Sequence, residues 1–325
     1  MTQARAARMT RTGGPEVIEW TDVGLPDPAP GEVRMRTTAV GLNFIDTYFR
    51  SGLYPSELPG GLGSEAAGVV EAVGDGVTLN VGDRVATFGP TRGAYATARN
   101  VPAAQLFAIP DDIDDETAAA VLLKGCTTEF LVERAAKVTA GDWVLVHAAA
   151  GGVGLLLVQW LKARGARVIG TVGSDAKVQA AREAGADAVI VSTREDVAAR
   201  VRAFTGGAGV RVTYDGVGKD TWTASLDATG RRGLIVSYGN ASGAVTDVAL
   251  GVLAAKGSLF CTRPTLFDYY ADPHDRETGI AALWDMIHSG KLRITIGQRY
   301  ALEDAAQAHL DLEARRTHGS TILLP

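Results

Sequence analysis

Apolar and polar residues alternate in short runs over residues 1–110. Residues 32–38 (EVRMRTT) show this alternation, and residues 69–73 and 84–87 are short runs rich in valine. Turn-forming proline, glycine and aspartate residues separate the runs. Short strands at this spacing are typical of a small β-barrel or sandwich. We therefore expect a β-rich first domain.

The pattern changes near Cys126, where strand-like apolar runs begin to alternate with helix-like runs. Such alternation predicts βαβ units and a parallel sheet. The expected strands are residues 143–146, 167–171, 188–191, 210–215, 233–237 and 258–261. The expected helices are residues 154–162, 175–184 and 194–204, and the tail adds helices at 279–288 and 303–315 and a strand at 322–324.

Composition narrows the class of protein. A length of 325 residues favours two domains. Glycine accounts for 39 of these residues, a larger share than the usual ~7%, but it does not recur at every third position as in collagen. The net charge of −5 argues against a nucleic-acid partner. Two cysteines cannot form a zinc cluster or a disulfide framework. With no apolar run after the N-terminal arginines, we expect a cytoplasmic protein without a targeting segment.

One uncharged stretch, residues 143–161, nearly reaches the length of a membrane span. Gly151, Gly152 and Gly154 lie in its middle. We interpret the stretch as a strand, a glycine turn and a helix in series, and we expect no membrane partner.

The glycine turn resembles a dinucleotide fingerprint. That fingerprint places glycine in three slots between a strand and a helix, and here the slots hold Ala149, Gly151 and Gly154. The second slot lets the backbone approach a pyrophosphate, and the third lets the helix pack closely on the sheet. The alternative is a tight packing turn without a ligand. We expect a dinucleotide site.

The end of the second strand of this unit favours NADPH over NADH. An NAD site usually ends that strand with an acid that binds the ribose 2′-hydroxyl, whereas this strand ends in Gly173 and Ser174. Ser174 and Lys177 suit a 2′-phosphate. Asp175 leaves the NADH alternative open, although we interpret it as the N-terminal charge of the next helix.

Eight segments resemble one family. The chain is similar to the zinc-independent quinone oxidoreductases of the medium-chain dehydrogenase/reductase superfamily, the group that includes zeta-crystallin. The segments that carry the resemblance are NFIDTY at 43–48, RSGLYP at 50–55, GSEAAG at 63–68, LKG at 123–125, AAAGGVG at 148–154, YDGVG at 214–218, SYGN at 237–240 and TRP at 262–264.

The resemblance implies a fold and an assembly. It implies an α/β protein in which a GroES-like β-barrel catalytic domain, residues 1–126 and 264–325, is joined to a Rossmann domain with a doubly wound parallel sheet, residues 127–263. It also implies an active site in the cleft between the domains and a homodimer formed through an edge strand, for which residues 258–261 are the candidate.

The resemblance further implies catalytic residues. Asn43, Asp46 and Tyr48 are expected on an early loop that lines the nicotinamide and substrate pocket; the alternative is a loop that caps its own backbone. Tyr54 matches a proposed proton donor of enoyl reductases; the alternative is a packed tyrosine. Thr127 is expected to approach the cofactor.

The expected cofactor-binding residues surround the glycine turn and the strand ends. Lys124 could instead extend along apolar surface from a helix end, and Arg263 could contact a diphosphate or a dimer neighbour. Arg316 resembles a position near the 2′-phosphate, with solvent exposure as the alternative. Ser192 replaces a tyrosine that often stacks near the adenosine, which weakens that contact. The full set is Phe44, Lys124, Ala150, Gly151, Gly152, Val153, Gly154, Gly173, Ser174, Lys177, Ser192, Val217, Ser237, Tyr238, Gly239, Asn240, Phe260, Thr262, Arg263 and Arg316.

We expect no metal. The superfamily's alcohol dehydrogenases bind catalytic zinc through cysteine and histidine, and the matching positions here are Asn43 and Ser64. The structural zinc lobe needs four close cysteines, which this chain lacks.

The resemblance implies hydride transfer from NADPH to a quinone. A quinone needs little help from a general acid, because its reduced oxygens are stable anions. One alternative is an NADPH-dependent reductase of α,β-unsaturated carbonyls, for which Tyr54 would matter more. A second is a non-catalytic NADPH-binding protein.

Overall fold

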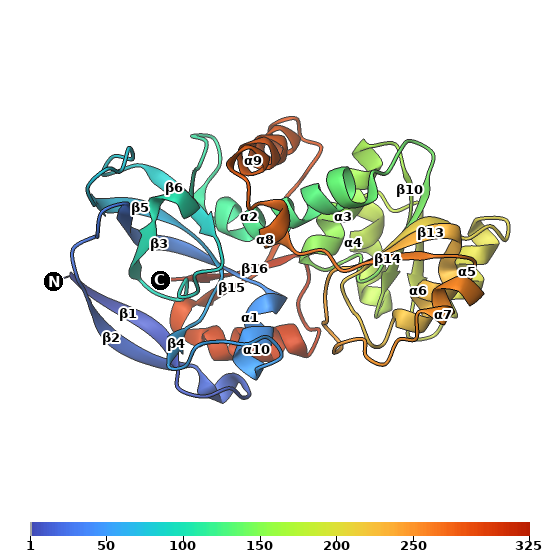
Figure 1. Cartoon of the computed structure of the whole chain (residues 1–325), viewed down its shortest axis with the longest axis horizontal. Coiled ribbons are helices and arrows are strands. Elements are labelled where there is room, and N and C mark those ends of the chain that lie inside the picture. The colour runs from blue at the N-terminus through green and yellow to red at the C-terminus, as the bar shows by residue number, and fades with distance from the viewer. Residues whose placement is uncertain (1) are drawn as a thin grey trace. The chain divides into compact units, whose positions relative to one another are not determined.

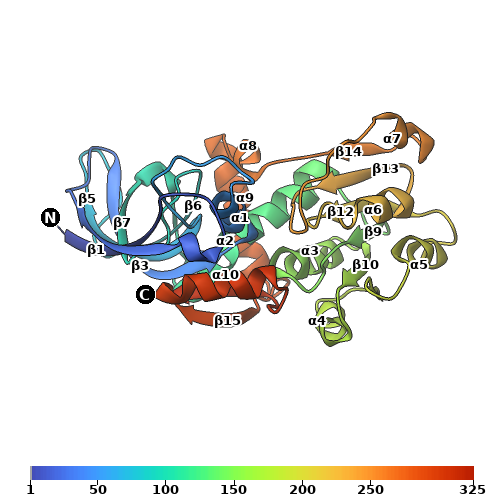
Figure 2. The same cartoon turned by 90° about the horizontal axis from the view of Figure 1, so that it is seen from below.

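The computed structural model, which describes residues 2–325, divides the chain into two units (Figures 1 and 2). Unit 1 contains the residues up to Leu123 together with Ile294–Pro325, and unit 2 is Lys124–Arg293. The first boundary therefore lies inside helix α2 (Asp115–Glu129).

The second boundary falls after helix α9 (Pro273–His288), whereas we expected it after residue 263. Packing explains the difference. A Cβ atom on Gly125 would come within 2.5 Å of Leu283 Cδ1, and the Tyr270 hydroxyl donates to Glu129 Oε2 over 2.8 Å. The segment that carries α8 (Leu266–Tyr269) and α9 is thus anchored on unit 2.

Unit 1 is the β-rich part of the chain, as its alternating pattern predicted. A three-stranded sheet runs in the order β2-β1-β4, and a larger sheet runs β15-β16-β3-β5-β6-β8, with β7 paired to β3. Met9, Met35, Leu62 and Tyr95 are fully buried in its core. Its strands are β1 (Thr2–Met9), β2 (Glu19–Leu25), β3 (Glu32–Leu42), β4 (Gly60–Gly61), β5 (Glu65–Val73), β6 (Arg84–Phe88), β7 (Ala98–Pro102), β8 (Leu106–Ala108), β15 (Ile296–Ala301) and β16 (Ser320–Leu324).

Unit 2 contains the expected parallel sheet. Its order, β11-β10-β9-β12-β13-β14, with every pair parallel, is that of a dinucleotide-binding domain. β14 is one of the two edge strands (Figure 2), and β11 is the other. The strands are β9 (Trp143–Val146), β10 (Arg167–Val172), β11 (Ala188–Val191), β12 (Val210–Asp215), β13 (Thr229–Ser237) and β14 (Phe260–Thr262), and the helices between them are α3 (Gly152–Ala163), α4 (Val178–Glu183), α5 (Val197–Phe204), α6 (Trp222–Ala228) and α7 (Gly251–Ala255).

The expectation of a loop at residues 43–48 was wrong, because helix α1 (Phe44–Ser51) begins there. Asn43 precedes the helix in an extended conformation, and the Asp46 carboxylate accepts its backbone N–H over 3.0 Å. Gly52 ends the helix with φ of 84°. A first-turn acid that accepts this N–H stabilises a short helix, so the local capping that we considered is present, but on a helix.

The uncharged stretch at 143–161 forms strand β9, a turn and most of α3, as interpreted. Over residues 2–325, no helix is both long enough and apolar enough to cross a membrane.

Candidate active site

The turn between β9 and α3 is held too tightly for a larger residue at Gly154. A Cβ atom there would lie 2.2 Å from the Ala148 carbonyl oxygen and 2.9 Å from Ala149 Cα. Ala149, in the first slot, packs in turn on β10, because a Cβ on Gly170 would come within 2.7 Å of its own Cβ. Gly154 therefore serves the close helix–strand packing that the fingerprint requires.

Helix α3 begins at this turn with its N–H groups available. Gly151 is its N-cap, and no side chain caps it. Ala150, Gly152 and Val153 supply the backbone of the turn and the first helical residues. Such a helix start, with a concentration of free N–H groups, binds phosphate, so the residues present fit the pyrophosphate of NADPH.

A buried polar network lies beneath the turn. His147 is fully buried, with Nδ1 3.2 Å from Thr171 Oγ1 and Nε2 3.1 Å from Ser225 Oγ. Ser225 donates to Asp215 Oδ2 over 2.6 Å. Its hydroxyl oxygen is then left to accept from His147 Nε2, which fixes the tautomer. Burial lowers the pKa of His147, so the ring is neutral.

Asp215, the last residue of β12, connects this network to the loop that follows β12. Its Oδ1 accepts the backbone N–H groups of Val217 at 2.9 Å and Gly218 at 3.0 Å, and Thr221 Oγ1 donates to it at 2.8 Å. The network therefore shapes the Val217 loop. Our sequence reasoning missed His147 and Asp215, although both end parallel strands, where ligands bind in open α/β sheets.

Arg263 fixes the loop that follows β13. Its Nη1 donates to the carbonyl oxygens of Ser237 at 2.9 Å and Gly239 at 3.0 Å. Tyr238 is part of the same turn, since a Cβ on Gly216 would come within 2.7 Å of its ring. Arg263 thus orders residues 237–240 from within unit 2. Asn240 closes this loop, while Phe260 and Thr262 lie on β14.

The end of β10 presents an open, polar surface. Gly173 and Ser174 are exposed, and a Cβ on Gly173 would meet nothing within 4 Å. Asp175 forms an ion pair with Arg194 at 2.5 Å. Lys177 ends the short turn that Asp175 begins. The Asp175 carboxylate is therefore held by a neighbouring cation. Ser192 donates to the Val172 carbonyl over 3.2 Å.

In unit 1, Asn43 and Asp46 belong to a buried hydrogen-bond network. Asp46 accepts from Ser64 Oγ at 2.7 Å and from the Tyr95 hydroxyl at 3.2 Å. Asn43 Nδ2 donates to Glu65 Oε2 at 2.8 Å. Both carboxylates are fully buried, and their contacts hold the first turn of α1 on strand β5.

A second set of contacts ties α1 to α10 (Ala305–Glu313). Arg50 pairs with Glu313 at 2.7 and 3.0 Å, and its Nη1 lies 3.3 Å from His309 Nδ1. His309 Nε2 lies 2.9 Å from the Tyr95 hydroxyl, which donates to Asp46. His309 is fully buried, and burial with the nearby Arg50 charge lowers its pKa to about 3.

Aromatic side chains gather on and beside α1. The Tyr48 ring lies 5.1 Å from that of Tyr54, edge to face, and 6.3 Å from that of Phe44. Phe49 lies 5.8 Å from Tyr54 in a second edge contact. Edge and offset contacts of this kind are favourable. We refer to Phe44, Tyr48, Phe49 and Tyr54 as the aromatic cluster.

The donor set does not fit zinc. At the superfamily's ligand positions, Asn43 donates to Glu65 and Ser64 donates to Asp46. Zinc sites of this superfamily need thiolate and imidazole. The described residues contain no group of three histidine, cysteine, aspartate or glutamate side chains placed to hold a metal.

The remaining expected residues are spread over both units. Lys124 and Thr127 lie on α2 and are buried, at the start of unit 2. Arg316 lies in unit 1, where its Nε donates to Asp311 over 2.9 Å. Most of the expected cofactor residues thus lie at or after the strand ends of unit 2, whereas Phe44 and Arg316 lie in unit 1 and Lys124 lies on α2.

Comparison with known families matches both units. Residues 29–111 match the alcohol dehydrogenase GroES-like domain, and residues 152–270 match the zinc-binding dehydrogenase family. These matches correspond to the β-rich unit and to the parallel-sheet unit.

Individual relatives extend over the whole chain. A quinone oxidoreductase of Pseudomonas aeruginosa is 52% identical, covering 99% of this chain and all of the relative. A 2-haloacrylate reductase of a Burkholderia species is 43% identical, with 98% of each chain covered. The crystal structure of Escherichia coli quinone oxidoreductase complexed with NADPH matches with a TM-score of 0.97 and 46% identity, covering 99% of this chain and 100% of the other.

Proposed function

The chain belongs to the quinone oxidoreductases of the medium-chain dehydrogenase/reductase superfamily, and we propose that it reduces quinones with the site residues described above. It is an NADPH-dependent oxidoreductase whose fold combines a GroES-like unit with a Rossmann unit. The observation that carries the assignment of residues is the β9–α3 turn, where Gly154 leaves no room for a side chain and α3 starts uncapped.

Bound NADPH supplies the hydride for the reaction. The chain's own residues bind and orient it. The start of α3 holds the pyrophosphate, and Ser174 and Lys177 bind the 2′-phosphate. The network from His147 to Asp215 keeps the Val217 loop in one conformation, and Arg263 does the same for residues 237–240. Orientation of this kind provides a large part of the rate of a hydride transfer.

The aromatic cluster contacts the acceptor. A flat quinone ring packs well against the edges and faces of aromatic side chains. The buried Asp46 and Glu65 hold α1 in place and are not general acids, because their oxygens already accept hydrogen bonds from Ser64, Asn43 and Leu123. Quinone reduction can proceed without a general acid at this site, because the reduced oxygens of a quinone are stable as anions.

A second candidate activity is the reduction of α,β-unsaturated carbonyls. The observation in its favour is the 43% identity to the 2-haloacrylate reductase. This reaction adds a hydride to one alkene carbon and a proton to the other, so it needs a proton donor. Tyr54 is the candidate, because a phenol hydroxyl can donate a proton and Tyr54 belongs to the aromatic cluster.

NADPH oxidation with 1,4-benzoquinone and with 2-alkenals, in wild type and Tyr54→Phe, separates the activities. We expect fast quinone turnover that Tyr54→Phe leaves mostly intact, with alkenal turnover abolished. Tyr300→Phe is the matched control, since Tyr300 bonds Asp311 outside the aromatic cluster. An equal collapse of both activities in Tyr54→Phe would contradict these roles. NADPH binding without turnover of either acceptor would leave only the binding function.

We further propose a homodimer formed through β14. This strand is one edge of the sheet, and its Phe260 is 63% exposed. Leu250, which precedes α7, is 78% exposed. An exposed edge strand has unpaired backbone N–H and C=O groups, and with large apolar side chains beside it a second copy of the chain can pair with it. We expect analytical ultracentrifugation to show a dimer for the wild type and a monomer for Phe260→Glu. The same molecular mass for both proteins would count against this interface. Cys126 and Cys261 form no disulfide, which is consistent with a cytoplasmic location.

A further inference from the structure

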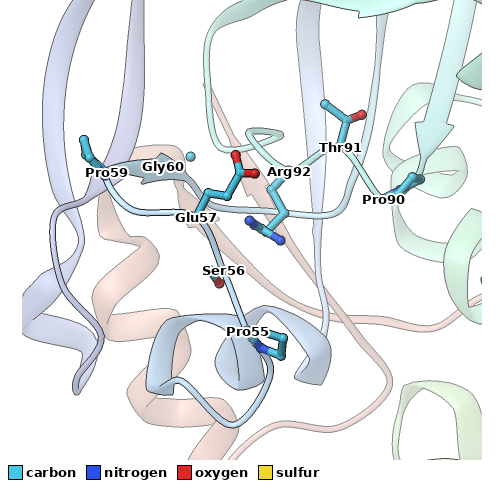
Figure 3. Close-up of a pocket in the computed structure, with 9 residues that line it drawn as sticks. Pro55, Ser56, Glu57, Pro59, Gly60, Pro90, Thr91 and Arg92 are labelled. Atoms are coloured by element: carbon cyan, nitrogen blue, oxygen red, sulfur yellow. The ribbon is translucent and has the colours of Figure 1, made fainter.

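A pocket of about 680 Å³ lies within unit 1, beside the aromatic cluster. Its walls come from residues 55–57, 59–61 and 90–92, and the first of these segments directly follows Tyr54. Figure 3 shows the side chains of Glu57 and Arg92 in the space between residues 55–61 and residues 90–92. The function proposed above gives this pocket no role.

Arg92 joins the pocket to the aromatic cluster. Its guanidinium carbon lies 4.6 Å from the centroid of the Phe49 ring, a cation–π distance. Phe49 in turn contacts Tyr54. Glu57 lines the same pocket, but its carboxylate is not within ion-pair distance of Arg92 in the part of the chain that the structure describes. The Arg92 guanidinium therefore lines the pocket while it stacks on the Phe49 ring.

Arg99, on β7, places a second positive charge behind the wall. Arg99 is only 8% exposed, its Nε has no hydrogen-bond partner, and none of residues 2–325 forms an ion pair with it. Its Nη1 makes a long contact of 3.4 Å with the carbonyl oxygen of Thr91, a residue of the pocket wall. Burial lowers the pKa of Arg99 to about 10. A buried cation without a counter-ion is costly, and a bound anion in the pocket would offset that cost.

We infer that this pocket binds a carboxylate carried by the acceptor, with Arg92 forming the direct contact and Arg99 supplying the buried positive charge behind it. Guanidinium groups suit carboxylates because two parallel N–H groups match two oxygens. The pocket adjoins the aromatic cluster, so a ring held by the cluster would extend an acidic side chain toward Arg92. The inference rests on the proposed function, and it names the substrate class as flat electrophiles with a short acidic tail.

The test uses a matched pair of acceptors, a benzoquinone with a propanoate side chain and its methyl ester. The two rings react alike and differ in one charge. With NADPH saturating, we expect kcat/KM for the acid to exceed that for the ester by about tenfold, the size of one charge-assisted contact. We expect Arg92→Met to remove the preference by raising KM for the acid alone, and Arg92→Lys to keep part of it.

Three further variants locate the effect. Arg99→Met should also lower the preference while leaving the melting temperature equal or higher, because an uncompensated buried charge is removed. Glu57→Gln should raise the preference, since it removes a like charge from the pocket. Arg36→Met is the matched control; Arg36 pairs with Glu71 on a half-exposed face and does not line the pocket, so it should change nothing.

The outcomes separate this inference from the function on which it rests. Equal kcat/KM for acid and ester in wild type overturns the inference and leaves quinone reduction intact. If neither ring is turned over, the proposed function fails, and calorimetric binding of the acid and ester to the NADP⁺-saturated protein decides the inference alone. Inorganic phosphate at constant ionic strength should compete with the acid only. With NADPH kept saturating, so that phosphate does not displace the cofactor, equal inhibition of acid and ester by phosphate would identify a site for free anions and overturn the inference.

Discussion

His309 should make the protein sensitive to acid. The ring is fully buried between Arg50 and Tyr95, and its pKa falls from 6.5 to about 3 in the folded protein. Below pH 6.5, the ordinary pKa of histidine, His309 is protonated in the unfolded chain. In the folded protein it stays neutral until the pH approaches about 3. The pH-dependent effect of His309 on the free energy of unfolding is therefore negligible above about pH 6.5, and it lowers that free energy progressively as the pH drops toward about 3.

The magnitude follows from the two pKa values. For one group whose pKa falls from 6.5 to about 3, lowering the pH from 7 to 5 costs ~2 kcal/mol of stability. The perturbation is His309→Gln, which keeps an N–H for Tyr95 but does not titrate. We expect the variant to be less stable at pH 7 and to lose ~2 kcal/mol less than wild type between pH 7 and pH 5.

Urea unfolding followed by tryptophan fluorescence at both pH values measures the difference. Tyr95→Phe is the control: it removes the hydrogen bond to His309 Nε2 but keeps the buried imidazole, so it should destabilise the protein and retain the wild-type pH dependence. If His309→Gln retains the wild-type pH dependence, the buried, neutral ring is not its source and the reasoning is refuted.

Two predictions concern the cofactor site. Gly154→Ala should weaken NADPH binding at least about tenfold, because its methyl group would overlap the Ala148 carbonyl and push α3 from the turn; titration of NADPH fluorescence measures this, and Gly251→Ala, where a Cβ meets nothing, should bind normally. Lys177→Ala should raise KM for NADPH about five- to tenfold and leave KM for NADH unchanged, the effect expected from one exposed contact to a phosphate; equal changes for the two cofactors would assign Lys177 another role.

Much of unit 2 could be predicted from the sequence. The bounds of β9, β11 and β12 match the expected strands, because each is a short run rich in valine that ends at, or is followed by, a polar residue. The helix expected at 194–204 begins at Val197 instead, since Asp196 accepts the N–H of Ala199 and caps it there. A single side chain that caps a backbone is enough to move a helix boundary.

The site in unit 1 could not be predicted in the same way. Helix α1 has only eight residues, too short for a clear period, and an isolated helix of that length is marginal. What holds it is a set of contacts between residues far apart in the chain, such as Arg50 with Glu313 and Ser64 with Asp46. Sequence patterns report local structure, and these pairs depend on which strands and helices become neighbours.

The buried polar residues explain why a chain rich in acids lacks an evident general acid. Asp46, Glu65 and Asp215 all lie in segments that carry the family resemblance, and each accepts hydrogen bonds that fix a loop or a helix start. Neutral His147 and His309 are likewise committed to neighbours on both ring nitrogens. Moving a proton through any of these groups would break hydrogen bonds that, in the function we propose, orient the cofactor and the acceptor. A reaction whose hydride comes from NADPH and whose product is a stable anion needs no such movement, so the same buried groups that would hinder acid–base catalysis are well suited to holding two flat rings in position.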